Sequence, residues 1–253
     1  MKCAIMHPTY IPWLGYFDLI DQVDKFVFLD NVKVVKSTWH VRNKIKTHQG
    51  EIFLTVPLEK KKGKNERIFC ETLVNVREPW QKKHLRSIEL AYIKAPFFKE
   101  VFPFIQDLLK SDETILSEFN IRIIEKVSTS LGIKKELIKA SQLKNISGQK
   151  DLLLVSICKE IGCDYYLAVQ GSAGYIEKNS PGGELTKNGI SLYYKNYEHP
   201  RYNQLHGDFI SYMSIVDLLF NYGFNSSLKV IKNGRRNSID CVSYRNNFLI
   251  KDS

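Results

Sequence analysis

The predicted fold is decided by residues 3–47, which read CAIMHPTYIPWLGYFDLIDQVDKFVFLDNVKVVKSTWHVRNKIKT. An apolar run, Cys3 to Met6, is followed by a segment whose apolar residues recur at helical spacing from Trp13 onward. Pro12 suits the first turn of that helix, because the amide that proline lacks has no helical partner there. The next apolar run, Phe26 to Leu29, has the character of a buried strand. Strand, helix and strand in this order predict a βαβ unit.

Polar residues follow both predicted strands of this unit. His7 comes directly after the first strand and Asp30 directly after the second. In open α/β sheets, ligands bind beyond the carboxyl ends of the strands, and a helix N-terminus there suits a phosphate group. A neutral imidazole at this place can contact a phosphate oxygen or act in proton transfer. We therefore expect His7 and Asp30 to be candidate catalytic groups, although a histidine that only caps its strand is an equally open interpretation.

Alternation of strands and helices continues along the chain. Further strands are predicted at residues 51–58, 67–74, 136–142, 165–169 and 190–194. Apolar residues at helical spacing predict three helices between residues 78 and 132, one at 149–161, and one at 213–222 that Gly223 ends. The sequence thus predicts an α/β protein with a mostly parallel, Rossmann-like sheet of the nucleotidyltransferase (HUP) type and an α-helical insert. We divide the chain into 1–77 and 133–228, the two halves of the α/β domain, 78–132, the insert, and 229–253, a basic C-terminal tail that we expect to be partly loose.

The composition is that of an ordinary globular protein. Hydrophobic residues make up 43% and charged residues 25% of the 253 residues. No apolar run is long enough to span a bilayer, and the N-terminus lacks the features of a signal peptide, so we expect a cytoplasmic protein. The five cysteines form no CxxC pair, which favours free thiols over a disulfide framework and predicts no metal site. The net charge of +10 favours polyanionic partners such as RNA or nucleotide phosphates, unless the lysines only keep the protein soluble.

Basic side chains surround an aromatic one after the second predicted strand. The candidates for substrate binding here are Trp39, His40, Arg42, Asn43 and Lys44. Cations can hold phosphates and a flat ring can stack on a base, so this segment suits a nucleotide or a nucleic acid. A solvated basic loop is the alternative. A second basic cluster, Lys60 to Lys64, is more typical of a mobile surface loop than of a phosphate clamp.

Small and polar residues follow the strand at 165–169. The loop that begins at Gln170 and ends at Tyr175 could offer backbone amides and the Ser172 hydroxyl to a ligand, although a plain strand-to-helix turn fits equally well. Gln170, Ser172 and Tyr175 are therefore further binding candidates. The sequence contains no Walker loop, GxGxxG, GxSxG or HExxH motif.

Asp217 and Asn221 share one face of the late predicted helix, because they are four residues apart. A carboxylate in so apolar a helix costs free energy unless it is paired. We expect Asp217 to be a third candidate catalytic group that meets a basic or hydroxyl partner in the site, with a purely structural bond as the alternative. Asn221 and Tyr202, which lies in an aromatic-rich polar stretch, complete the candidates in this region.

Motifs spread over nearly the whole chain are similar to those of the WbqC-like family. They are His7 to Trp13 with Gly15-Tyr16-Phe17, Arg42 to Ile45, Trp80 with His84, Tyr92 with Ala95-Pro96-Phe97, and Ser214 to Asn221 with Gly223. Tyr10 and Trp13, which belong to the first motif, join the candidate substrate-binding residues. The family commonly has Gln after the first His, where this sequence has Pro8, so any ligand contact of that Gln must be made by another group.

The resemblance implies a bacterial enzyme of surface-polysaccharide (O-antigen, lipopolysaccharide) biosynthesis that transfers an aminoacyl group, such as glycine, to the amine of a nucleotide-linked amino sugar. The donor would be an aminoacyl-tRNA or an aminoacyl-adenylate. His7 would then act as a base or contact phosphate, Arg42 and Lys44 would hold phosphates, and Gln170, Ser172 and Asp217 would hold the acceptor. Two alternatives stay open: a nucleotidyltransferase-like enzyme acting on a nucleoside triphosphate with a divalent metal, and a non-catalytic protein that binds RNA or an assembly complex.

Overall fold

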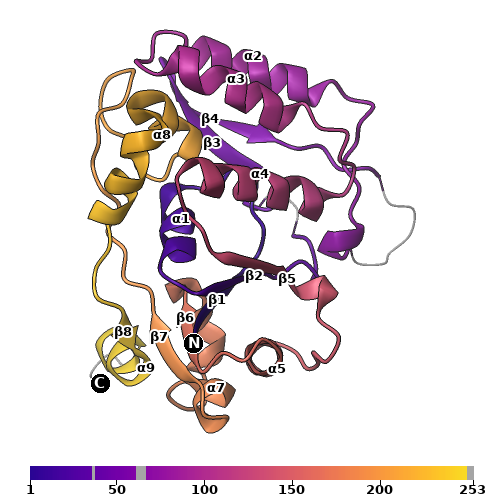
Figure 1. Ribbon diagram of the computed structural model, residues 1–253, viewed down its shortest axis with the longest axis vertical. Helices are drawn as coiled ribbons and strands as arrows, with labels where there is room; N and C mark the ends of the chain where they lie inside the picture. Colours follow the sequence, from indigo (N-terminus) through magenta and orange to yellow (C-terminus); the bar gives the residue numbers. More distant parts are fainter. Residues whose placement is uncertain (36–37, 61–66, 250–253) are drawn as a thin grey trace.

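A computed structural model describes residues 1–35, 38–60 and 67–249, and within them it shows a six-stranded sheet, flanking helices and a separate hairpin (Figure 1). The sheet strands are β1 Lys2–Met6, β2 Lys25–Phe28, β5 Glu136–Lys139, β6 Tyr165–Ala168, β7 Ser191–Tyr194 and β8 Ile239–Asp240. Their order is β5-β2-β1-β6-β7-β8, with every pair parallel except β7 and β8. Numbered within this sheet, the order is 3-2-1-4-5-6, which is that of doubly wound sheets. The predicted fold class is confirmed.

The sheet is buried on both faces, as parallel sheets are. Successive side chains of a strand point to opposite faces. Accordingly Ala4 of β1 packs in one apolar cluster, whereas its neighbours Cys3 and Ile5 pack in a second one. The first cluster holds the helices α1 Leu14–Asp21, α2 Trp80–Tyr92, α3 Phe98–Leu109, α4 Leu116–Ser130 and α8 Ile215–Asn233. The second holds α5 Asp151–Glu160, α6 Ala173–Ile176, α7 Gly183–Lys187 and α9 Cys241–Tyr244.

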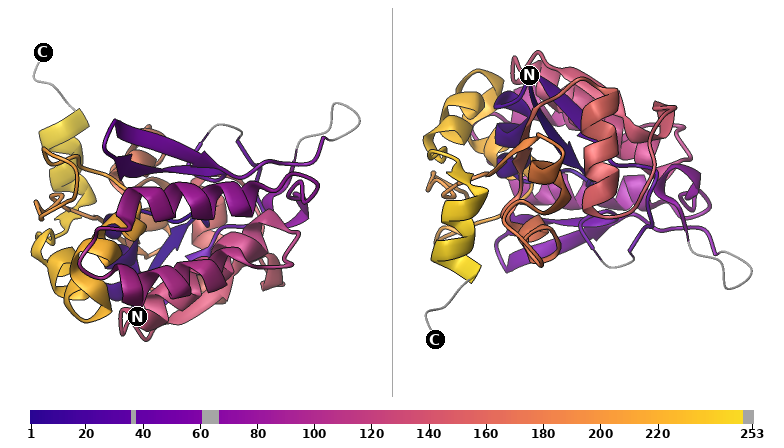
Figure 2. Two further views of the ribbon diagram at one scale, coloured as in Figure 1. Left: turned by 90° about the horizontal axis from the view of Figure 1, so that it is seen from above. Right: turned by 90° about the horizontal axis from the view of Figure 1, so that it is seen from below.

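Two predicted strands differ from the structure. Residues 51–58 do not join the main sheet, because β4 (Gly50–Thr55) pairs antiparallel with β3 (Arg42–Thr47) in a hairpin of its own. Figure 2 shows this hairpin at the edge of the molecule, with α2 running alongside it. Residues 67–74 form no strand; they contain a 3-10 turn, Phe69–Glu71, and make only single bridges to separate segments.

The late helix does not end at Gly223. That glycine has φ of 65°, which kinks α8, and the helix then resumes as far as Asn233. A β-carbon on Gly223 would lie 2.6 Å from the Phe97 ring, which fills the kink. Phe97 also donates its backbone N–H to the Phe220 carbonyl. The insert helices therefore pack directly on α8.

The segment from residue 229 is not loose as far as Leu249. It finishes α8 and then forms β8, α9 and a π-helical turn, Arg245–Leu249. Ion pairs join Arg235 to Asp18 and Asp21, which anchors this segment to α1. Residues 250–253, and residues 61–64 of the predicted basic loop, lie outside the described residues.

Candidate functional site

A two-lobed cavity lies at the carboxyl end of the sheet, where the strand order reverses between β1 and β6. Ligands of doubly wound sheets bind at such a switch point. The inner lobe, about 270 Å³, is lined by the end of β1, by α1, and by the residues after β6 and β7: Met6, Trp13, Gly15, Tyr16, Leu19, Val169, Gln170, Gly171, Lys195 and Tyr197. The outer lobe, also about 270 Å³, is lined by Met6, Thr9, Trp13, Tyr16, Trp39, Asn43 and Tyr212. The two lobes share three residues, and we call them together the crevice.

The indole of Trp13 borders both lobes. It stacks on His199 with ring centroids 5.9 Å apart and meets Tyr197 edge-on at 5.6 Å. Tyr212, half exposed, lies 5.2 Å away on the outer side. The indole also covers the first turn of α1, where Gly15 leaves room for it: a β-carbon there would stand 2.2 Å from the ring. The position of the indole, and with it the shape of the crevice, therefore depends on the absence of a β-carbon at Gly15.

The loop between β1 and α1 is held in a strained conformation. Ile11 has φ of 34°, an outlier for a β-branched residue, and it precedes a proline. Such strain persists only where the surroundings enforce it. Here the buried amide of Asn43 donates from Nδ2 to the carbonyls of Tyr10 at 3.1 Å and Ile11 at 2.8 Å. Tyr212, at the other side of the outer lobe, also has a positive φ, of 60°.

Lys195 brings a nearly buried amine to the inner lobe, since its side chain is only 5% exposed. Its Nζ donates to the Gly15 carbonyl at 2.9 Å and lies 3.1 Å from the Asp18 carboxylate. The amine also stands 3.8 Å from the centre of the Tyr197 ring. Burial lowers the pKa of Lys195 to about 8, against the opposing effect of Asp18. A lysine in this state can exchange a proton near neutral pH.

His7 and Asp30, the candidate catalytic groups at the strand ends, line neither lobe of the crevice. The Nδ1 atom of His7 lies 3.2 Å from the Leu29 carbonyl, and its ring lies 4.8 Å from that of His40, so the imidazole is turned toward β2 and lines neither lobe. Burial lowers the pKa of His7, and burial together with His7 lowers the pKa of His40 to about 4. Asp30 is fully buried and accepts bonds from the N–H of Ser141 at 2.8 Å and its hydroxyl at 2.6 Å.

Comparison with known proteins identifies the family. The sequence model of the WbqC-like protein family matches residues 7–228, which contain every residue that lines the crevice except Met6. The chain belongs to the WbqC-like protein family. It is 34% identical over 224 residues to the uncharacterized protein Rv1507c of Mycobacterium tuberculosis (strain ATCC 25618 / H37Rv), an alignment that covers 88% of this chain and 94% of the relative. No solved structure matches the chain.

Four of the residues predicted to bind substrate line the crevice of this WbqC-like protein. Trp13 and Gln170 line the inner lobe, and Trp13, Trp39 and Asn43 line the outer one. Gln170 donates from Nε2 to the carbonyl of Lys195 at 3.2 Å, which joins the loops after β6 and β7. The assignment of these residues to substrate binding stays a prediction.

Arg42 and Lys44 lie beside the outer lobe, on the exposed face of the hairpin. The Arg42 guanidinium covers the Phe53 ring at 4.4 Å, and Trp39 approaches the same ring at 6.2 Å. Lys44 pairs with Glu51 at 2.6 Å. Trp39 is 48% exposed, so an aromatic and cationic strip continues from the crevice onto the hairpin.

The other predicted residues are engaged elsewhere. The Tyr10 hydroxyl is buried and bonded to Nδ1 of His84 at 2.9 Å. The Ser172 hydroxyl donates to the Val169 carbonyl at 2.7 Å. Tyr175 is 39% exposed on α6, and partial burial with Asp151 nearby raises its pKa to about 12. None of these three side chains lines either lobe.

Asp217 has the hydroxyl partners that its sequence context predicts, but not in the crevice. Its carboxylate is fully buried and accepts from the hydroxyls of Tyr92 at 2.9 Å and Tyr202 at 2.8 Å. Burial raises the pKa of Asp217. Asn221 donates from Nδ2 to the Asp217 carbonyl at 2.7 Å. This cluster joins α8 to α2 and to the segment before α8.

Sequence reasoning missed Lys195 and Asp18. Lys195 directly follows β7, so the rule that selected His7, a polar residue at the carboxyl end of a strand, would have selected it as well. Asp18 is a charged residue in the apolar face of α1, and a charge there requires a partner. Three tyrosines that line the crevice were also missed, because nothing in the neighbouring sequence distinguishes them from aromatic residues of the core: Tyr16, Tyr197 and Tyr212.

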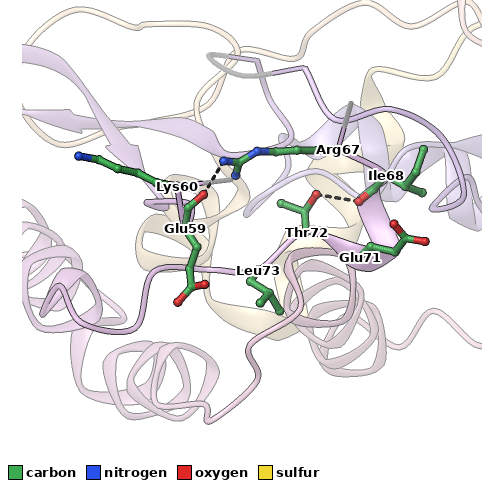
Figure 3. Close-up of a pocket in the computed structure, with 7 residues that line it drawn as sticks. All are labelled: Glu59, Lys60, Arg67, Ile68, Glu71, Thr72 and Leu73. Atoms are coloured by element: carbon green, nitrogen blue, oxygen red, sulfur yellow. Dashed lines mark hydrogen bonds between the residues drawn. The ribbon is translucent and has the colours of Figure 1, made fainter. Parts of the chain in front are cut away.

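A further cavity of about 410 Å³ lies beside the 3-10 turn at Phe69–Glu71 (Figure 3). It is lined by Glu59, Lys60, Arg67, Ile68, Glu71, Thr72 and Leu73, so both signs of charge occur in it. The Arg67 guanidinium already donates to the Glu59 carbonyl. Within the described residues, no group of three or more His, Cys, Asp and Glu side chains is placed to hold a metal ion, and no helix has the length and apolarity that crossing a membrane requires.

Proposed function

We propose that this protein is a cytoplasmic enzyme of bacterial surface-polysaccharide (O-antigen, lipopolysaccharide) biosynthesis that transfers an aminoacyl group, such as glycine, to the amine of a nucleotide-linked amino sugar. Membership of the WbqC-like family supports the pathway. The observation that carries the reaction class is the pair of lobes that meet at Met6, Trp13 and Tyr16. Two ligands held in these lobes would have their reactive ends side by side, which is the arrangement that group transfer requires.

The inner lobe suits the acceptor sugar. Its lining combines the rings of Trp13 and Tyr197 with polar groups of Gln170 and Lys195. Sugars present both apolar faces and hydroxyls, so a lobe with rings and a few placed polar groups fits them. Gln170 would orient a hydroxyl of the sugar.

The outer lobe suits the aminoacyl donor. Its wall includes Trp39, and the strip continues to Phe53 and Arg42 on the hairpin. A nucleobase would stack on the exposed indole, and Arg42 and Lys44 would attract phosphates. Both an aminoacyl-adenylate and the 3′ end of an aminoacyl-tRNA present this chemistry. The net charge of +10 supports a polyanionic donor.

The reaction requires no change of oxidation state. The amine nitrogen of the sugar attacks the carbonyl carbon of the aminoacyl ester or anhydride. A carbon–nitrogen bond forms and the bond from that carbon to the leaving oxygen breaks. One proton leaves the nitrogen, and the leaving oxygen receives one if it departs as a hydroxyl.

The test is to incubate the protein with nucleotide-linked amino sugars and either glycyl-tRNA or glycyl-adenylate, and to analyse the sugar nucleotide by mass spectrometry. We expect a mass gain of one glycyl unit that depends on the protein and is lost in Trp13→Ala. Release of pyrophosphate from a nucleoside triphosphate, without an acylated sugar, would support the nucleotidyltransferase alternative. Salt-dependent RNA binding with no product from any pair would support the non-catalytic alternative.

A further inference from the structure

One buried carboxylate, that of Asp18, is shared by two cations beneath the inner lobe. Its Oδ1 accepts from Nε of Arg235 at 2.9 Å, and its Oδ2 lies 3.1 Å from Nζ of Lys195. Gln22 also donates to Oδ2, at 2.6 Å. The Asp18 side chain has no exposed surface, so in the folded protein these cations rather than solvent balance its charge. A buried carboxylate that lost its only cation would be strongly destabilised.

Arg235 makes Lys195 free to lose its proton. A guanidinium stays charged at all ordinary pH values, whereas a buried ammonium does not. If Lys195 becomes neutral, Asp18 still has the Arg235 charge beside it, and a second carboxylate, Asp21, holds the other end of the guanidinium at 2.5 Å. In an isolated lysine–aspartate pair, the same proton loss would leave a bare buried charge. The charge arrangement therefore favours titration of Lys195.

The hydrogen bonds of Lys195 also suit its neutral form. A neutral amine has two N–H groups and one lone pair. The Gly15 carbonyl and the Asp18 carboxylate would take the two N–H groups. The lone pair is then left without a competing donor among these contacts. Burial, helped by Arg235, lowers the pKa of Lys195 to about 8, so a useful fraction is neutral near pH 7.

We propose that Lys195 is the catalytic residue that accepts the proton from the acceptor amine, and that Asp18 and Arg235 position it; this inference rests on the proposed function. As the amine nitrogen attacks the acyl carbon, its proton moves to Nζ of Lys195. The new carbon–nitrogen bond forms while the bond to the leaving oxygen breaks. The Lys195 ammonium then gives the proton to that oxygen or to water, which restores the neutral amine.

The first test compares Lys195→Met and Lys195→Arg with the control Lys25→Met. Lys25 is also partly buried, donating to the Ile161 carbonyl at 3.0 Å, but it begins β2 and so lies at the opposite edge of the sheet. We expect kcat to fall about 100-fold or more in both Lys195 variants, with KM for the sugar nucleotide within about threefold of wild type. Arginine keeps the charge but cannot accept a proton, so near wild-type activity of Lys195→Arg would overturn the proposal.

The second test is the pH profile of Arg235→Met. Wild-type kcat/KM should fall as pH drops through about 8, and without Arg235 this limb should move to higher pH because Asp18 then holds Lys195 in its charged form. The acceptor amine titrates equally in both proteins, so it cannot move the limb. An unshifted limb would contradict the proposal. So would an acyl adduct on Lys195 after incubation with the donor alone, since the lysine would then be a nucleophile.

A third measurement needs no acyl transfer. Acetic anhydride labels neutral amines, so labelling of Lys195 against pH, followed by peptide mapping, reports its protonation directly. We expect a labelling midpoint near pH 8 for Lys195 in the wild type, against about 10.4 for a lysine in a model peptide. A wild-type midpoint of Lys195 near 10.5 would overturn the proposal. A midpoint near 8 in a protein that acylates no sugar would refute the proposed function and leave the titrating lysine in place.

Discussion

The indole of Trp13 lies over Gly15, and a β-carbon on residue 15 would stand 2.2 Å from it. Since this indole borders both lobes, we expect Gly15→Ala to displace the ring and lower acyl transfer at least tenfold. Alanine favours a helix over glycine by about 1 kcal/mol. This gain opposes the cost of displacing the indole, so the free energy of unfolding should change little. The matched control is Gly174→Ala, because a β-carbon there meets nothing within 4 Å. Equal activity of the two variants would show that the indole does not shape the site.

Asn43 should hold the strained loop between β1 and α1. Its Nδ2 serves two buried carbonyls, those of Tyr10 and Ile11. We expect Asn43→Ala to lower the free energy of unfolding by about 2 kcal/mol, because both carbonyls lose a partner. Urea unfolding measures this, with Asn145→Ala as control, since the Asn145 side chain donates to Glu160 at the surface. A loss no larger than that of the control would contradict the assigned role.

His40 and His84 should make the fold sensitive to acid. Burial lowers the pKa of each to about 4, against 6.5 for an ordinary histidine. Between these pH values the unfolded chain binds more protons than the folded one. The contribution of each histidine to stability is therefore fully present above pH 6.5 and is lost as the pH drops toward 4. The loss of stability on acidification is at most on the order of 3 kcal/mol for each histidine.

The measurement is the free energy of unfolding in urea at pH 7 and pH 5. His84→Gln should be less stable than wild type at pH 7, because the Tyr10 hydroxyl loses its partner, yet lose less stability on acidification. His48→Gln, at the exposed turn of the hairpin, is the control for replacing a histidine that is not buried. Parallel curves for wild type and His84→Gln would contradict the prediction.

Asp217 should prove structural. Replacement by Asn removes the charge from two hydrogen bonds, those of Tyr92 and Tyr202, and we expect a loss of about 2 kcal/mol in stability. The kcat and KM of the folded variant should stay within about threefold of wild type, since Asp217 lines neither lobe. Thermal melting and steady-state kinetics separate the two effects. A large fall in kcat at full folding would return Asp217 to the catalytic candidates.

Trp39 and Arg42 should act on the donor alone. Trp39→Ala should raise KM for the aminoacyl donor about tenfold through lost stacking, with KM for the sugar nucleotide unchanged. Arg42→Ala should reduce the slope of the logarithm of donor affinity against the logarithm of salt concentration by about one, which corresponds to one lost phosphate contact. The control is Arg86→Ala, because Arg86 pairs with Glu89 on the exposed side of α2. A change in acceptor KM instead would reverse the assignment of the two lobes.

The fold was predictable because the deciding patterns are local. Strand, helix and strand follow one another within residues 3–47, and the alternation continues from residue 136, so a mostly parallel sheet could be predicted from short-range periodicity. The hairpin escaped prediction because β3 looks like a charged loop, with Arg42, Lys44 and Lys46 on alternate positions. The kink at Gly223 escaped because it depends on Phe97, which is distant in sequence.

The position of the candidate crevice could be predicted, but the surroundings of its side chains could not. The rule about strand ends pointed to the edge of the sheet where Trp13 and Gln170 line the crevice. It could not tell that His7 is turned toward β2, because the side-chain direction is set by contacts with Leu29 and His40. The state of Lys195 depends on Asp18 and Arg235, two residues far from it in the chain, and no window of sequence contains all three.

The ring of Phe97 in the kink of α8 has a consequence for protein engineering. Phe97 belongs to the helical segment 78–132, and the second half of α8 leads directly to Arg235, which holds Asp18. Excising that segment to obtain a minimal enzyme would therefore empty the bend and loosen the guanidinium at the far end of the helix. The segment supports α8 and should not be removed on its own. Chimeras between relatives should exchange the segment together with α8.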